Sequence, residues 1–413
     1  MPETIAPESA RNIFFVGWSD QGGRSDGAQI MVNKRHAFIA HPFSGGLTVV
    51  DVADPRAPKP VAFLPVHPRS WSIHCQAFGD LLLVIEEFDF FKLQVKDYYG
   101  RSLDLSDPKL TGKRGVDYSA GLRVYDISNP GKPRAIGFME VDGFGLHRLW
   151  WDGGRYVYAT ALLHGYTDHI LMIVDLAEPT RPIEVGRWWL PGMWKAGGET
   201  NDFSGRVALH HAIVAGDTAY AAWRNGGITL LDVKDKSAPK LIAHRNWCPP
   251  FGGNTHTALP LPGRNLLVVD DEASADISVE PIKHTWIFDI RVPSNPVSIA
   301  TVPVPSDQDY LAKGGQFGPH NLWENRPEGF VTSEYVFATY QSAGLRIFDI
   351  RNPFRPEEVA YFVPPPPKGW FDPRGDIKHV LHSVDVWVDP DGLMYLTDYN
   401  AGLYILQWDG RRG

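Results

Sequence analysis

A short motif recurs seven times along this chain and restricts its fold more than any other feature. The motif is a strand-like run of Gly, Leu and further apolar residues that usually ends in Asp, and most copies are followed by a turn that contains proline. Because proline lacks an amide donor, it belongs outside the hydrogen-bonded ladder and marks where a strand has ended. The copies lie at residues 46–51, 121–126, 170–175, 227–232, 284–289, 344–349 and 402–407.

The spacing between copies is about 50 to 75 residues, the size of a four-stranded propeller blade with its loops. Other strand-like segments precede each copy, so the motif is expected on strand C, the third of each blade. The chain ends after the last strand C, and residues 11–17 form a strand that can supply the missing outer one. The sequence therefore predicts an all-β fold, a seven-bladed β-propeller in one domain (1–413), closed by an N-terminal strand that completes the last blade.

This repeated unit of strand and proline turn resembles the LVIVD-repeat family of β-propellers. The resemblance extends over nearly the whole chain. It implies the propeller fold but no activity, because propellers host many unrelated functions.

Charge and composition indicate which partners to expect. The formal net charge is −8, which argues against nucleic acid, since phosphate binding needs a basic surface. We find no run of about 18 apolar residues and therefore expect no membrane-spanning helix. The N-terminus lacks signal-peptide features, and Cys75 and Cys248 do not make a disulfide framework. We therefore expect a cytoplasmic protein.

Histidines recur at one place in six of the seven repeats, just before or within the segment expected to form the innermost strand. Innermost strands line the central channel, so these imidazoles should converge near one end of it. Neighbours on a strand face opposite ways, so only one of His210 and His211 can point at the axis, and the pattern does not decide which. The first repeat has no histidine at this place. The histidines of the series are His74, His147, His210 or His211, His256, His320 and His382.

Converging imidazoles predict a metal site, because neutral imidazole is a common ligand for transition metals and three or four ligands suffice. The expected arrangement is similar in architecture to carotenoid-cleaving oxygenases and selenium-binding proteins, although the motifs of neither family occur here. We expect a divalent metal, with Fe2+ favoured over Mn2+, Cu2+ or Zn2+. The competing interpretation is that the histidines are structural and make hydrogen bonds that stabilise the fold. The histidine before the innermost strand (strand A) has this role in WD-type propellers.

Carboxylates near the ends of the second strands are candidates to orient the imidazoles or to act as bases. Those expected to be catalytic are Glu86, Glu87 and Asp271. Asp270, Glu272 and Asp398 are further candidates to orient histidines.

Long loops are expected on the face where the innermost strands begin, and long loops over a rigid scaffold usually carry function. They are the insertion 88–119 in the second blade and the connections 191–206, 305–318 and 364–378. Their aromatic residues either form a wall for an apolar or aromatic small molecule or only pack the loops together. The residues expected to bind a substrate are Phe91, Tyr99, Trp194, Phe317 and Trp370.

Three functions are compatible with these patterns. The first is a metal-dependent enzyme that acts on a small apolar or aromatic organic substrate, most favourably as an oxygenase or another oxidoreductase. In the second, the metal acts as a Lewis acid in a lyase, isomerase or hydrolase. The third is a non-catalytic binding propeller with structural histidines. Metal analysis of the purified protein separates the first two from the third.

Overall fold

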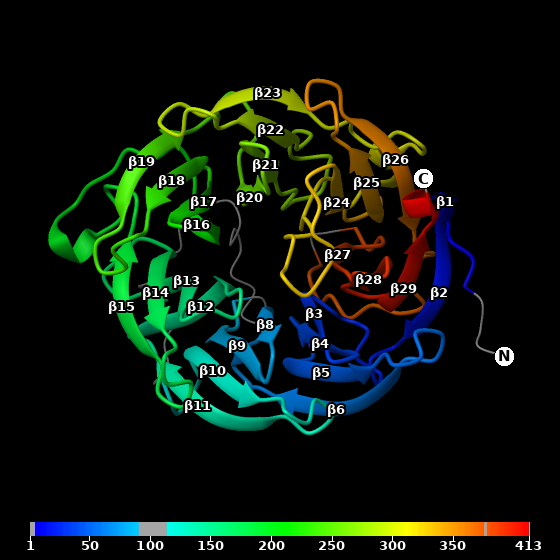
Figure 1. Cartoon of the computed structure of the whole chain (residues 1–413), viewed down its shortest axis with the longest axis horizontal. Helices are drawn as coiled ribbons and strands as arrows, with labels where there is room; N and C mark the ends of the chain where they lie inside the picture. Colours follow the sequence, from blue (N-terminus) through cyan, green and yellow to red (C-terminus); the bar gives the residue numbers. More distant parts are fainter. Residues whose placement is uncertain (1–4, 91–113, 376–377, 413) are drawn as a thin grey trace.

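Antiparallel strands follow one another around a central axis, and each group of strands runs from the axis to the rim of the ring (Figure 1). The computed structural model describes residues 5–90, 114–375 and 378–412. The helical elements within these residues are short, namely α1 (Tyr310–Lys313), η2 (Lys195–Gly197) and η3 (Asp409–Arg412). The fold is an all-β propeller, as the repeat predicts.

The first complete sheet along the chain has four strands: β3 (Ile30–Asn33), β4 (His36–His41), β5 (Gly46–Asp51) and β6 (Lys59–Pro65). The next strands are β7 (Ser70–Trp71), β8 (Cys75–Phe78), β9 (Leu81–Phe88), β10 (Gly121–Asp126) and β11 (Arg134–Glu140). They are followed by β12 (Gly143–Trp150), β13 (Tyr156–Leu163), β14 (Ile170–Asp175) and β15 (Ile183–Trp188).

The second half of the ring repeats this arrangement. It contains β16 (Val207–Ala215), β17 (Thr218–Arg224), β18 (Ile228–Asp232), β19 (Lys240–Arg245), β20 (Thr255–Leu261), β21 (Leu266–Asp271), β22 (Thr285–Asp289) and β23 (Val297–Thr301). It ends with β24 (Tyr335–Thr339), β25 (Leu345–Asp349), β26 (Glu357–Val363), β27 (Ser383–Val388), β28 (Leu393–Asp398) and β29 (Gly402–Trp408). Leu322 forms an isolated bridge with Ala338, which places the segment around His320 at the inner side of β24.

Every copy of the sequence motif forms a strand with one further strand outside it. In each of these outer pairs, an aliphatic residue of the motif strand faces a Gly or Ala beside a register shift. The small residue lets the bulged outer strand bend close to its neighbour. The pairs are Val49–Ala62, Val124–Gly137, Ile173–Gly186, Leu230–Ala243, Ile287–Ala300, Ile347–Ala360 and Ile405–Gly17.

Three of these small residues touch the proline turn of the next repeat. A Cβ atom added at Gly186 would lie 1.9 Å from the carbonyl oxygen of Lys236, and one added at Gly17 would lie 2.1 Å from that of Pro55. Gly137 meets the carbonyl oxygen of Pro179 in the same way, at 2.6 Å. In these three cases the turn after the motif therefore docks on the outer strand of the repeat before it.

Substitution of Gly186 by Val should destabilise the protein by about 2–3 kcal/mol, because the new side chain must displace backbone rather than a movable side chain. Chemical denaturation of the variant measures this loss. Gly369→Ala is the control, since a Cβ atom there meets nothing within 4 Å. Equal stability of the Gly186→Val variant and the wild type would contradict the docking contact.

The N-terminus contributes two strands to the end of the ring. β1 (Ser9–Arg11) pairs antiparallel with β26, and β2 (Ile13–Ser19) pairs antiparallel with β29. β2 thus takes the outer position in the sheet of β27, β28 and β29, and it overlaps the expected closing strand 11–17 over residues 13–17. Figure 1 shows the N-terminal strands beside the C-terminal ones.

Neighbouring sheets also pair directly near the axis. The end of the second strand in one repeat lies opposite the start of the innermost segment of the next. These pairs bring the second-strand ends beside the histidine series. The pairs are His41–Ser72, Glu87–Gly145, Arg224–Thr255 and Gln341–Ser383.

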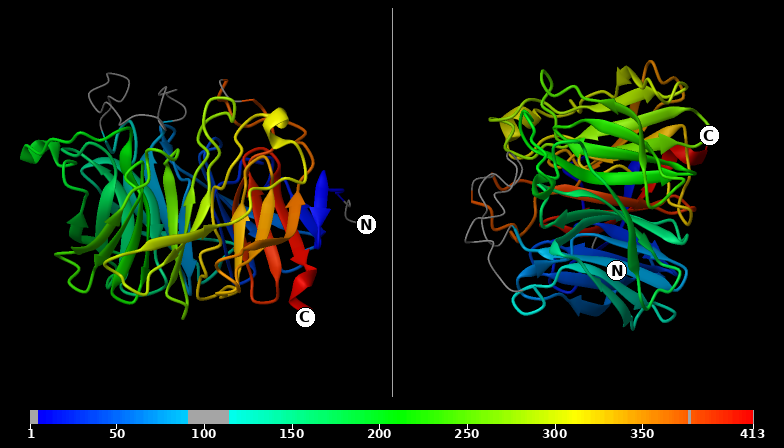
Figure 2. Two further views of the ribbon diagram at one scale, coloured as in Figure 1. Left: turned by 90° about the horizontal axis from the view of Figure 1, so that it is seen from above. Right: turned by 90° about the vertical axis from the view of Figure 1, so that its left-hand side faces the viewer.

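The connections that carry η2 and α1 lie on one face of the ring. Figure 2 shows η2 and α1 on the same side, with η3 on the opposite side. The innermost strands begin on the first of these faces, so this face is the one nearest the histidine series. Among the described residues, no helix is long and apolar enough to cross a membrane.

Candidate functional site

Five of the predicted histidines line one small pocket at the axis. They are held by inner segments of successive repeats, so each imidazole comes from a different part of the ring. His147 lies on β12, His210 on β16 and His256 on β20, while His320 precedes β24. The five lining histidines are His74, His147, His210, His256 and His320.

Four of these rings form a continuous row. The ring centroids of His147 and His210 are 5.2 Å apart, those of His210 and His256 are 3.7 Å apart, and those of His256 and His320 are 4.8 Å apart. All four side chains are at least 90% buried. The row is therefore a packed set of imidazoles, in the place that the sequence predicts.

The Nδ1 atoms of three rings are held by acceptors. His210 Nδ1 lies 2.8 Å from the carbonyl oxygen of His256, and His320 Nδ1 lies 2.7 Å from that of Val384. His147 Nδ1 lies 3.0 Å from Glu87 Oε2. Because these oxygens only accept, each Nδ1 carries the proton, and the lone pair of the neutral ring is on Nε2. This is the tautomer that metal-bound histidines use.

The electrostatics keep the rings neutral. Burial lowers the pKa of His147 to about 4, against the opposing effect of Glu87. Burial also lowers the pKa values of His210 and His256 well below their usual range, and adjacent imidazoles lower them further. The pKa of His320 is lowered by burial too, although Glu272 opposes this. Neutral rings at pH 7 have lone pairs available for a ligand.

Glu272 faces two of the imidazoles from the end of β21. Its Oε1 lies 3.5 Å from His320 Nε2, and its Oε2 lies 3.8 Å from His256 Nε2. These distances are too long for hydrogen bonds. The three ligand atoms lie within 4.8 Å of one another, and Arg224 pairs with the same carboxylate. The group His256, Glu272 and His320 offers two imidazoles and one carboxylate to a common point.

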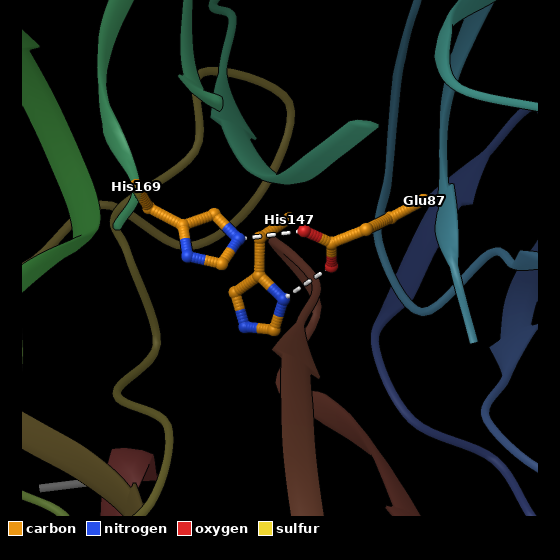
Figure 3. A group of neighbouring side chains, drawn as sticks. All are labelled: Glu87, His147 and His169. Atoms are coloured by element: carbon orange, nitrogen blue, oxygen red, sulfur yellow. Dashed lines mark hydrogen bonds and ion pairs between the residues drawn. The ribbon is translucent and has the colours of Figure 1, made fainter. Parts of the chain in front are cut away.

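A second buried group surrounds Glu87 (Figure 3). Besides His147, Glu87 accepts a hydrogen bond from Trp71 Nε1 at 2.9 Å, and its Oε1 lies 2.6 Å from His169 Nε2. Burial alone would raise the pKa of Glu87, but the charge of His169 and the hydrogen bonds from both histidines lower it to about 2. Glu87 is thus an ionised carboxylate that holds two imidazoles in place.

His169 continues this network away from the pocket. Its Nδ1 lies 2.7 Å from Asp168 Oδ1, and Arg206 donates to Asp168 at 2.8 Å and 3.0 Å. Burial would lower the pKa of His169, but Glu87 and Asp168 raise it. His169 lies outside the histidine series of the sequence, because it precedes the motif strand (strand C) rather than the innermost strand of its repeat. The pair Asp168 and His169 directly before a motif strand was the available signal.

His210 rather than His211 reaches the pocket. His211 lies one residue further along β16 and turns to Glu324, with its Nε2 2.8 Å from Glu324 Oε1. This resolves the alternative that the sequence left open. His382 is buried and stacks on Tyr399, with ring centroids 4.4 Å apart, and is not among the residues that line the pocket.

His74 has the opposite tautomer to its neighbours. The backbone amide of Leu149 donates to His74 Nδ1 at 3.4 Å, so Nδ1 is the acceptor and the neutral ring carries its proton on Nε2. A ring in this state donates a hydrogen bond from Nε2 instead of offering a lone pair.

The expected catalytic carboxylates have different surroundings. Glu86 points away from Glu87, as neighbours on a strand do, and pairs with Arg123 and Ser119. Asp271 accepts hydrogen bonds from Trp247 and Trp286, at 2.9 Å and 2.8 Å, and so faces outward between strands. Of the three, Glu87 is the one that contacts a pocket histidine.

The described residues of the expected aromatic wall, Trp194, Phe317 and Trp370, do not line the axial pocket. Trp194 packs on Trp189, with centroids 5.8 Å apart, and is 41% exposed. Phe317 is buried and stacks on Tyr310 at 5.0 Å. Trp370 stacks on His379 at 4.8 Å. Phe91 and Tyr99 lie outside the described residues. The described aromatics therefore pack against neighbouring rings of their own loops.

Polar residues complete the pocket where aromatic ones were expected. Arg148 and Arg224 line it together with Asn321 and Gln29, and sequence analysis singled out neither arginine. Arg148 directly follows His147, so its position beside the histidine series was the available signal. Gln29 and Ala28 occupy the place of the missing histidine in the first repeat.

Comparison with known proteins supports the fold. The LVIVD repeat model matches residues 26–61, 116–140, 165–189 and 211–245. The β-propeller domain of Cps50 (Swd1) from Myceliophteria thermophila is similar, with a TM-score of 0.55 and 12% identity over 93% of this chain and 97% of that domain. The periplasmic gluconolactonase PpgL of Pseudomonas aeruginosa has a TM-score of 0.54 and 12% identity over 97% of this chain and 100% of PpgL. No curated protein matches this chain.

Proposed function

Because the chain carries LVIVD repeats on a β-propeller, a fold with many functions, we propose its function from the axial pocket. We propose that it is a metal-dependent enzyme that acts on a small organic substrate, most favourably as an oxygenase or another oxidoreductase. The observation that carries this proposal is the group of His256, His320 and Glu272, whose ligand atoms face one another without a hydrogen bond between them.

The donor set fits a divalent ion. Two ligand atoms bound to one ion at about 2.1 Å lie roughly 3.0–3.4 Å apart, and the two Glu272–histidine distances are 3.5 Å and 3.8 Å. Two histidines and one carboxylate, with further positions left open, are the ligands of many non-haem iron oxygenases. This favours Fe2+ over Mn2+, Cu2+ or Zn2+. A ferrous ion held there would supply a site for dioxygen chemistry.

The neighbouring residues would assist in separate roles. His210 stacks on His256 and offers its own Nε2 lone pair, so it is the candidate for a fourth ligand. His147 also has a free Nε2 lone pair, and Glu87 behind it would stabilise the ring when it takes up a proton. We therefore assign proton transfer in the pocket to His147.

Metal analysis of the purified protein tests the proposal. The protein is prepared without a nickel column, stripped with a chelator and loaded with Fe2+ under anaerobic conditions. We expect close to one iron per chain, measured by elemental analysis. If Fe2+, Mn2+, Cu2+ and Zn2+ all fail to bind at stoichiometric levels, the proposed function is excluded.

We further propose that the ring has seven blades and that β2 closes it. The support is the repeated pair of an aliphatic and a small residue beside a bulge, which recurs in all seven motif strands and includes Gly17 of β2. A truncation that begins at residue 20 is expected to lower the midpoint of thermal unfolding.

A further inference from the structure

We propose that the side of the axial pocket formed by His74 and Arg148 binds the carboxylate group of a small organic anion. The inference rests on the proposed function, in that it takes this pocket as the place where a substrate binds. It adds the chemical class of that substrate.

His74 contributes a donor that has no acceptor. Its Nδ1 accepts from the amide of Leu149, which leaves the proton on Nε2. The side chain is 2% exposed, it lines the pocket, and its Nε2 has no hydrogen-bond partner among the described residues. A buried N–H group without a partner is destabilising, and a ligand oxygen at this place would remove that cost.

Arg148 contributes a second donor. Its Nη1 donates to Asn321 Oδ1 at 2.5 Å and its Nη2 to Glu324 Oε1 at 3.0 Å, which fixes the plane of the guanidinium. Its Nε finds no acceptor in the part of the chain that the structure describes, and the side chain is 5% exposed. Arg148 is next to Leu149, which binds His74, so the two free donors belong to one wall of the pocket.

The charges around this wall favour an anion. Glu324 is shared between Arg148 and Arg326, so these three side chains together have a charge of +1. Arg224 and Glu272 neutralise each other on the opposite side. Glu87 is matched by His169. Asp385 also interacts with Arg148, and burial raises the pKa of its carboxyl to about 7, so the surplus positive charge at this wall is greatest below pH 7. A ligand with one negative charge would therefore be attracted before any metal is present.

Two donors suit the two oxygens of a carboxylate. Such charge-assisted bonds are stronger than those to a neutral acceptor. An amide of the same shape has only one carbonyl oxygen, and its NH2 group would face the donors of His74 and Arg148. The wall should therefore distinguish acetate from acetamide, although the two molecules have almost the same size.

Calorimetric titration of the metal-free protein tests the inference, with formate and acetate as ligands and formamide and acetamide as their neutral counterparts. We expect the carboxylates to bind and the amides to bind at least ~10-fold more weakly. Arg148→Gln and His74→Phe should each weaken acetate binding at least ~10-fold. Arg123→Gln, which removes a guanidinium paired with Glu86 outside the pocket, should leave it unchanged.

Several results would overturn the inference. They are no carboxylate binding by the wild type, equal binding of acetate and acetamide, or full acetate binding in both pocket variants. Thermal unfolding identifies any variant that fails to fold, and His74→Phe, which retains a ring of similar size, serves if Arg148→Gln does not fold. Because the titration uses metal-free protein, its failure is separate from a failure to bind metal.

Discussion

Replacement of Glu272 by Gln is expected to reduce the affinity for Fe2+ or Mn2+ at least ~100-fold, because changes outside the ligand set already cost 10- to 100-fold in metal sites. Gln retains an oxygen that can accept from Arg224, so the fold should persist while the charge that attracts the cation is lost. Equilibrium dialysis with elemental analysis measures the affinity, and Mn2+ allows the same measurement by electron paramagnetic resonance.

The chain offers a matched control on the same segment. Asp271 precedes Glu272 and bonds to Trp247 and Trp286, away from the axis. Asp271→Asn should therefore leave metal affinity within a few-fold of the wild type. An unchanged affinity in Glu272→Gln would remove this carboxylate from the ligand set, and retention of the metal in a His256→Ala and His320→Ala double variant would reject the whole site.

Substitution of Glu87 by Gln should destabilise the protein by about 3–5 kcal/mol at pH 6, because it leaves the buried cation of His169 with only one carboxylate. Glu86→Gln is the control, since Glu86 lies on the same strand and pairs with the partly exposed Arg123. Chemical denaturation of both variants and of the wild type measures the difference. A smaller loss in Glu87→Gln than in Glu86→Gln would contradict the network.

The pH dependence of this loss has a defined sign. The pKa of Glu87 is lowered to about 2 from its usual 4.5, so its contribution is complete above pH 4.5 and disappears as the pH falls towards 2. The pKa of His169 is raised above its usual 6.5, so its contribution is complete below pH 6.5 and is lost as the pH rises through the folded value. The difference between wild type and Glu87→Gln should therefore be largest between about pH 4.5 and 6.5.

The repeat made the fold predictable because one local pattern, a strand and a proline turn, recurs often enough to require a ring. The position of the histidines followed from the same regularity. His256 and His320 could be placed near the axis because innermost strands line the channel of any propeller.

The sequence could not decide which of two adjacent residues points into the pocket, because this depends on how the strands pair in three dimensions. His210 and His211, like Glu86 and Glu87, differ by one residue, and one residue reverses the direction of a side chain on a strand. Asp271 and Glu272 differ in the same way, although Glu272 lies just beyond the end of β21. His169 and Arg148 could not be ranked from sequence, because their roles depend on contacts with residues that are distant along the chain.

The direct pairs between neighbouring repeats affect when the row of four histidines can form while the chain is being synthesised. His147, His210, His256 and His320 each belong to a different repeat, and the pair of Arg224 and Thr255 joins two of these repeats. A partly synthesised chain that ends before His320 can complete individual repeats, yet it lacks the full row of four rings. Binding of the proposed metal would therefore depend on the folding of these repeats, and the ion would bind late, after they have assembled.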